Sequence, residues 1–132
     1  MIDWTQVVTV QDRRAAALQA AHARIQTWRD EQEKKDITFE HAGRTWDGGK
    51  VTRDRLQPVL ALAELPSGFF WTDHGNADVP VTLADLQSLN TAHEAALVAE
   101  GFRIHAAQRQ MKAAIESMTL QQLQAFKPDQ PA

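Results

Sequence analysis

The stretch SGFFWTDHGNADVPVTLADLQSL, residues Ser67–Leu89, decides how this chain is expected to fold. An aromatic run at Phe69–Trp71 leads into Thr72–Asp78, whose Asp, Gly and Asn residues favour the positive φ and side-chain hydrogen bonds of a hairpin tip. A β-branched stretch follows, and Thr82 with Asp85 three residues later predicts a capping box. The stretch therefore predicts a strand, a turn, a second strand and a capped helix.

A second hairpin is predicted earlier in the chain. Residues Ile37–His41 alternate apolar and polar side chains, Ala42 and Gly43 make a turn, and the chain returns through Arg44–Trp46. Phe39 and Trp46 are expected to face each other across the two strands. We expect the two hairpins to form one small antiparallel sheet.

Helices are predicted before, between and after the hairpins. The alanine-rich segment from about Val10 to Lys35 favours a helix, a second helix begins near Thr52, and the longest runs roughly from Leu83 to Ser117. Pro58 lies inside the second helix, where we expect a kink or a restarted turn. Thr119 is expected to cap a final turn at residues 120–126.

The first predicted helix carries a narrow apolar stripe. Leu18, Ala21, Ile25 and Trp28 recur at spacings of three, four and three, as in a coiled-coil seam. Such a stripe is expected to pack on another helix of the same fold or on a copy of the chain, and we expect self-association through it. Trp4, which precedes any predicted element, is a further candidate anchor. The candidate partner contacts are thus Trp4, Leu18, Ile25 and Trp28.

Together these elements predict an α+β protein. A long C-terminal helix and a middle helix cover the small antiparallel sheet of two hairpins, and the N-terminal helix projects. The expected divisions are an extended start and helical arm at 1–35, a compact domain at 36–126 and a tail at 127–132.

Composition narrows the function classes. At 132 residues the chain fits one domain, and without cysteine it has neither disulfides nor thiolate metal sites. A net charge of -3 gives no basic excess for a nucleic-acid backbone. No apolar run approaches the ~20 residues of a membrane span. We expect a soluble protein that binds neither nucleic acid nor membrane, intracellular or carried in a virion.

Motifs for chemistry are weak throughout. The five histidines include no pair at i, i+4, so no metal site is predicted. Counted from Asp73 as a calcium loop, Gly75 and Ala77 occupy positions that need oxygen ligands. None of the three serines lies in a nucleophile elbow. We therefore predict no catalytic residue and no cofactor, and assign the polar groups of the 73–78 turn to folding.

Several segments resemble a domain of unknown function from tailed-phage genomes, found in small proteins near tail-fibre genes and at the ends of tail-fibre-associated proteins. The resemblance covers roughly residues 25–118. It rests on Ile37–Phe39, Gly43–Asp47, Thr52–Leu56, Gly68–Asp73, Asn76–Thr82 and Lys112–Ile115. The aromatic-Trp-Thr-Asp pattern followed by Asn-x-Asp-Val-Pro is the most specific part.

This resemblance implies a context and no activity. It suggests a non-catalytic tail protein, such as a tail-fibre assembly chaperone or a fibre-associated adaptor. Its partner would be a tail-fibre or other tail protein, met in the host cytoplasm during assembly. A permanent structural component of the virion tail or baseplate and a small tail-tip hydrolase remain as alternatives, and a DNA-binding regulator is disfavoured by charge.

Overall fold

A computed structural model of the chain describes residues 9–128. They divide into two compact units, of which unit 2 is Lys34–Phe102 and unit 1 holds the described residues before and after it. The elements are α1 (Val10–Lys34), β1 (Ile37–His41), β2 (Arg44–Gly48), α2 (Lys50–Leu60), β3 (Phe70–Thr72), β4 (Asp78–Pro80), α3 (Leu83–Glu116) and α4 (Leu120–Ala125). The α+β class predicted from sequence is confirmed.

The first hairpin of unit 2 follows the predicted register. Strand β1 pairs antiparallel with β2, and Phe39 lies opposite Trp46. Ala42 and Gly43 have φ values of 51° and 74°, so both central turn residues adopt the left-handed conformation of a tight hairpin turn. Trp46 Nε1 donates to the carbonyl of His41 at 2.9 Å, which satisfies the indole of a buried ring.

The second hairpin forms a sheet of its own, so the expectation of one shared sheet is wrong. Strand β3 pairs antiparallel with β4, and β1 with β2 makes a separate two-stranded sheet. The backbone N–H of His74 donates to the carbonyl of Thr45 at 2.9 Å. The tip of the second hairpin therefore contacts β2 near the turn of the first hairpin. The strands of the two hairpins do not pair with each other.

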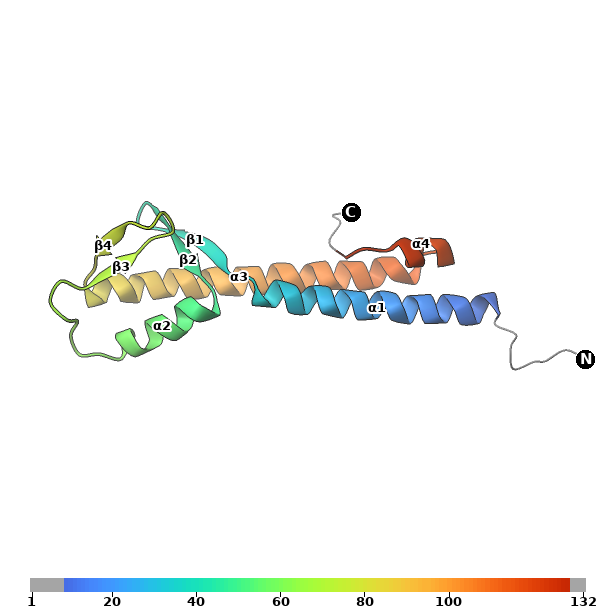
Figure 1. Cartoon of the computed structure of the whole chain (residues 1–132), viewed down its shortest axis with the longest axis horizontal. Helices are drawn as coiled ribbons and strands as arrows, with labels where there is room; N and C mark the ends of the chain where they lie inside the picture. The colour runs from blue at the N-terminus through green and yellow to red at the C-terminus, as the bar shows by residue number, and fades with distance from the viewer. Residues whose placement is uncertain (1–8, 129–132) are drawn as a thin grey trace, which may run out of the picture. The chain divides into compact units, whose positions relative to one another are not determined.

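Unit 2 is centred on a small apolar core. Its buried side chains come from both strands of the first hairpin, α2 and the first part of α3: Phe39, Trp46, Leu56, Leu86 and Leu89. Trp71 and Val79 of the second hairpin pack against this cluster. In Figure 1 both hairpins and α2 lie beside the first part of α3. The long helix thus supplies the surface on which the small elements pack.

Helix α2 begins and ends earlier than predicted. Its N-cap is Gly49, with φ 130° and no side-chain cap, so the helix starts two residues before Thr52. It continues through Pro58 to Leu60. Because proline has no backbone N–H to donate, one helical hydrogen bond is missing at Pro58, near the C-terminal end of α2. The helix ends two residues after Pro58, which leaves Leu62 outside it, and the expected kink or restarted turn stays a prediction.

Unit 1 contains α1, the last part of α3 and α4. Its core is Ala21, Ile25, Ile115 and Leu123. Contacts of Arg14 with the carbonyl of Met118 and of Arg29 with Gln108 show that α1 runs antiparallel to α3. The N-terminal helix is therefore docked on its own chain, and the expected projecting arm is corrected. The end of α3 and α4, assigned from sequence to the 36–126 domain, lie in the unit that contains α1.

Candidate binding site

The predicted contact stripe of α1 is mostly used by the fold. Ile25 is fully buried, Trp28 is 8% exposed, and Leu18 packs against the unit 1 core. Ile115 and Leu123 of the same chain form one core cluster with Ile25, and Leu18 packs against it. Much of the stripe is thus used within the chain, and self-association through Leu18, Ile25 and Trp28 stays a prediction. Trp4 lies outside the described residues.

Two arginines of α1 hold the ends of the neighbouring helices. Arg14 donates to the carbonyl of Glu116 at 2.7 Å and to that of Met118 at 3.2 and 3.3 Å, where α3 ends. Arg24 donates to the carbonyl of Leu123 at 3.1 Å and to that of Phe126, where α4 ends. Cations at helix C-termini satisfy the last carbonyls and oppose the helix dipole. Their position fixes the segment that follows α4.

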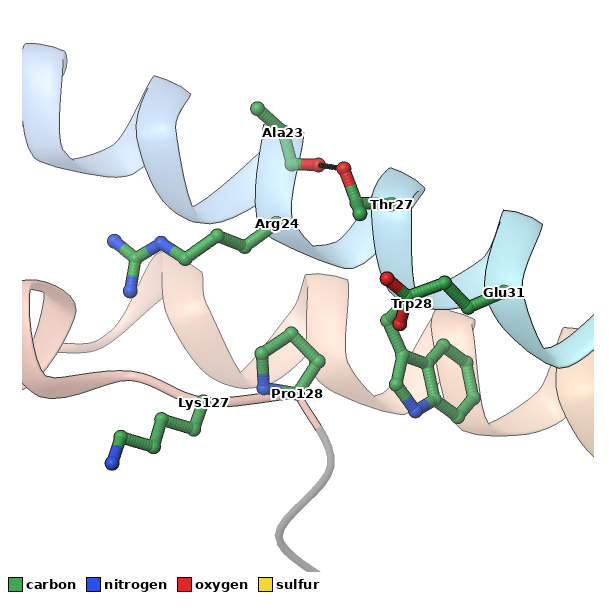
Figure 2. A pocket seen from close by; sticks show the side chains of 7 residues that line it. All are labelled: Ala23, Arg24, Thr27, Trp28, Glu31, Lys127 and Pro128. Carbon is green, nitrogen blue, oxygen red and sulfur yellow. Dashed lines mark hydrogen bonds between the residues drawn. The ribbon is translucent and has the colours of Figure 1, made fainter.

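This fixed segment closes one side of a shallow pocket of about 310 Å³ in unit 1 (Figure 2). The face of α1 between Ala23 and Glu31 forms the other side. The lining residues are Ala23, Arg24, Thr27, Trp28, Glu31, Lys127 and Pro128. The volume lies at the lower end of small-molecule pockets, which typically enclose ~300–1,000 Å³. The pocket suits one side chain or a short peptide segment.

Trp28 gives the pocket a polar group without a partner. Its Nε1 atom is buried and makes no hydrogen bond to any described residue. Figure 2 shows the nitrogen-bearing edge of the indole on the side of Pro128. An unsatisfied buried N–H costs about 1–3 kcal/mol. Because this atom is covered by its surroundings, an outside carbonyl reaches it only when the pocket lining moves. Trp28 is thus the one predicted contact residue that retains a binding capacity in the described part of the chain.

The rim of the pocket carries polar and charged side chains. The hydroxyl of Thr27 donates to the carbonyl of Ala23 at 3.1 Å, so it is held by its own helix. Glu31 and Lys127 are exposed and carry opposite charges. Arg24 is committed to the carbonyls of α4. An apolar floor with one N–H donor and two rim charges fits a peptide backbone flanked by small apolar groups.

The polar residues of the second hairpin tip serve the fold, as predicted. Asp73 accepts from the N–H of Ala77 at 2.8 Å and from Arg44 at 2.9 Å, and these contacts, the first foremost, lower the pKa of its carboxyl. His74 Nδ1 lies 2.6 Å from Asp47, and Asp78 accepts from the hydroxyl of Thr72 at 2.9 Å. The turn side chains therefore bind neighbours in the fold and do not converge on a cleft.

His93 is a fully buried polar residue of α3 that the sequence analysis did not single out. Its Nε2 accepts from the N–H of Gly49 at 3.0 Å, and its ring lies 5.4 Å from that of Phe39. Burial lowers the pKa of His93 below 6.5, which keeps the ring neutral. Its Nδ1 is buried without a partner among the described residues. The ring is enclosed by the core, so we assign it a structural role.

The described residues, 9–128, contain neither a candidate metal site nor a candidate membrane-spanning helix. No group of three or more His, Asp or Glu side chains there is arranged to hold a metal ion. No helix in the same range combines the length and apolarity that crossing a membrane requires.

Comparison with known proteins identifies the family. Residues 14–128 match the family model described as a domain of unknown function, DUF4376, and because this match covers most of the chain, the protein belongs to that family. No curated protein matches the chain, and neither does any solved structure. The matched range includes every residue that lines the Trp28 pocket.

Proposed function

We propose that this member of the DUF4376 family is a non-catalytic protein of bacteriophage tail assembly, acting as a tail-fibre assembly chaperone or a fibre-associated adaptor. It acts by binding another tail protein in the host cytoplasm. The resemblance of its hairpin segments to small proteins near tail-fibre genes supports the tail context. The Trp28 pocket supports the mode of action, because it provides a binding surface without reactive groups.

The unpaired indole N–H of Trp28 is the observation that carries this proposal. Most buried polar groups in proteins have a hydrogen-bond partner, and this covered donor would gain one if a partner segment displaced part of the pocket lining. A backbone carbonyl of an extended partner segment provides that acceptor. The apolar floor of the pocket then covers the adjacent side chain.

Co-expression with the tail-fibre protein of the same phage genome tests the proposal. The wild-type chain is expected to co-purify with the fibre protein, and Trp28→Phe is expected to weaken binding about tenfold, because ~1.4 kcal/mol of hydrogen bonding is lost. Trp46→Phe is the matched control, since Trp46 already donates to the carbonyl of His41. Equal binding by wild type and Trp28→Phe would exclude the pocket as the contact.

The protein content of purified phage particles separates the proposal from its nearest alternative. A chaperone leaves the fibre after assembly and is absent from purified particles, whereas a permanent tail or baseplate component is found in them by mass spectrometry. The chain in particles at fixed stoichiometry to the fibre would replace the chaperone with a structural role. Clearing of cell-wall material in a zymogram would favour the tail-tip hydrolase.

A further inference from the structure

The two sides of the pocket beside Trp28 are held differently. One side is α1, a continuous helix whose backbone is hydrogen-bonded from turn to turn. The other side is the segment after α4, which Arg24 bonds to α1 at the carbonyl of Phe126. Beyond that carbonyl, Lys127 and Pro128 make no hydrogen bond or ion pair with another described residue. Lys127–Pro128 is therefore the part of the pocket lining that can move.

The backbone of this segment is extended. Phe126 has φ -63° and ψ 130°, close to the polyproline II values of about -75° and 145°. A residue that precedes proline is restricted to extended conformations, and Lys127 is such a residue. The ring of Pro128 fixes its own φ at about -65°. The chain therefore reaches the pocket as a short extended segment that carries a proline.

Extended segments that contain proline are a ligand class that aromatic-lined grooves bind, because their conformation is largely formed before binding. Trp28 supplies the aromatic side chain of this pocket, and Figure 2 shows the ring of Pro128 beside the same pocket. Pro128 is half-buried, whereas Lys127 before it is exposed. Pro128 thus takes the place of a ligand that belongs to the chain itself.

The chain's own segment leaves the pocket incompletely bonded. The Nε1 atom of Trp28 is buried and has no acceptor among the described residues. A segment that replaces Lys127–Pro128 and places a backbone carbonyl at this atom makes one hydrogen bond more than the chain's own segment does. Glu31 is exposed on the rim and favours a basic residue beside the incoming proline.

We propose that the Trp28 pocket binds a proline-containing extended segment of a partner protein, and that Lys127–Pro128 occupies the pocket until this segment displaces it. The inference rests on the proposed function, in which Trp28 contacts the partner, and it adds the chemistry of the partner segment. Because the competing segment is tethered, its effective concentration is on the order of millimolar. A partner segment therefore binds more weakly to the intact chain than to a chain without Lys127–Pro128.

Deletion of residues 127–132 tests the displacement, and deletion of residues 129–132 is the matched control that keeps Lys127–Pro128. Without any partner, the indole N–H of Trp28 is expected to exchange with solvent faster in the first variant, as followed by nitrogen-15 NMR. Pro128→Gly keeps the chain length and is expected to exchange at an intermediate rate. Equal exchange in the two deletion variants would overturn the proposal.

Both deletion variants keep the packing of α4. Leu123 is fully buried, and Phe126, which packs against the unit 1 core, is retained in each. Circular dichroism and thermal melting are expected to show the same helix content and closely similar melting temperatures. Pro128→Gly gives an independent readout on the complete chain, because its Trp28 indole exchanges faster than in wild type only if the proline ring covers that edge.

Decaproline is the probe for the partner chemistry, and a glycine–serine peptide of the same length is its control. Decaproline is expected to shift the Trp28 indole proton and to leave that of Trp46, which is bonded to the carbonyl of His41. If the open form is ~10% or less of the intact chain, deletion of residues 127–132 lowers the Kd about tenfold or more. No shift at millimolar decaproline, or an equal response to the control peptide, would overturn the proposal.

These experiments on the isolated chain are separable from the test of the proposed function. If decaproline binds at Trp28 and the tail-fibre protein does not bind, the ligand class of the pocket stands and the proposed partner is wrong. If the tail-fibre protein binds through Trp28 with the same affinity to both deletion variants, the proposed function stands and the displacement of Lys127–Pro128 is wrong.

Discussion

The imidazole Nε2 of His93 accepts a hydrogen bond of 3.0 Å from the backbone N–H of Gly49 and thereby links the middle of α3 to the start of α2. The two residues are 44 positions apart in the sequence. Gly49 is the N-cap of α2 and has no side chain to satisfy the exposed N–H groups of the first turn. An imidazole from another helix accepts from the N–H of the N-cap residue itself, the bond that a Glu or Gln at N3 makes in a capping box.

Stability should depend on pH through His93. Burial, reinforced by Arg53 and opposed by Glu94, lowers the pKa of His93 below 6.5 in the folded state. Between the folded and unfolded pKa values the unfolded chain binds the extra proton, so the free energy of unfolding is highest above about pH 6.5 and falls as the pH is lowered. Thermal melts from pH 8 to about pH 5 measure this loss.

His93→Gln should flatten that dependence, and His105→Gln, at an exposed position of the same helix, should leave it intact. A second loss of stability is expected at lower pH, through two carboxylates. The pKa values of Asp73 and Asp85 are lowered from 3.8, so their contribution is present above that value and disappears as the pH falls through the folded pKa. A melting temperature that stays constant between pH 8 and pH 5 would contradict the assignment for His93.

Gly48→Ala should destabilise unit 2. An added Cβ would lie 2.9 Å from Cδ2 of His93 and 2.9 Å from Cγ1 of Ile37. Because both neighbours are packed in or beside the core, overpacking should cost about 1–3 kcal/mol. Gly75→Ala is the control, since its Cβ would meet only Asp73 at an ordinary 3.5 Å. Urea unfolding of the two variants is expected to separate them, and equal midpoints would be inconsistent with the packing described.

Arg14→Ala should loosen the end of α3. Arg14 donates to the carbonyls of Glu116 and Met118, and charge-assisted bonds of this kind contribute about 1.5–3 kcal/mol when partly buried. Faster amide hydrogen exchange is expected in α4 and the last turn of α3. Arg13→Ala removes an exposed cation one residue earlier and should leave exchange unchanged. Similar amide hydrogen exchange in both variants would contradict the capping role of Arg14.

The two buried tryptophans should respond differently to loss of the indole N–H. Trp46→Phe removes a hydrogen bond of 2.9 Å to the carbonyl of His41 and leaves that carbonyl without its donor. Trp28→Phe removes an N–H that has no partner in the described residues. Both changes cost packing, but Trp46→Phe should cost about 1 kcal/mol more. Calorimetric melting of the isolated chain checks the difference, and a larger loss from Trp28→Phe would contradict it.

Local sequence signals predicted the elements well. The pairs Thr9–Asp12 and Thr82–Asp85 form capping boxes, and Thr119 forms one with Gln122. Phe39 lies opposite Trp46 as the alternation required. These features depend on residues within a few positions of one another, so their chemistry is visible in a short window.

Features that depend on distant residues were not predictable in the same way. The start of α2 depends on His93, and the docking of α1 depends on Arg14 and Arg24 meeting carbonyls more than ninety positions away. The apolar stripe of α1 was recognised, but its spacing alone could not show that Ile115 and Leu123 would cover it. The pocket at Trp28 requires Pro128 from the opposite end of the described chain, and no local motif marks it.

The most direct test of a binding role for the pocket follows the four indole N–H resonances by nitrogen-15 NMR. Titration with the tail-fibre protein is expected to shift the Trp28 indole proton downfield, as it gains a carbonyl acceptor, while the Trp46 proton keeps its position. A fibre protein that binds to saturation and leaves the Trp28 resonance unmoved would contradict the account.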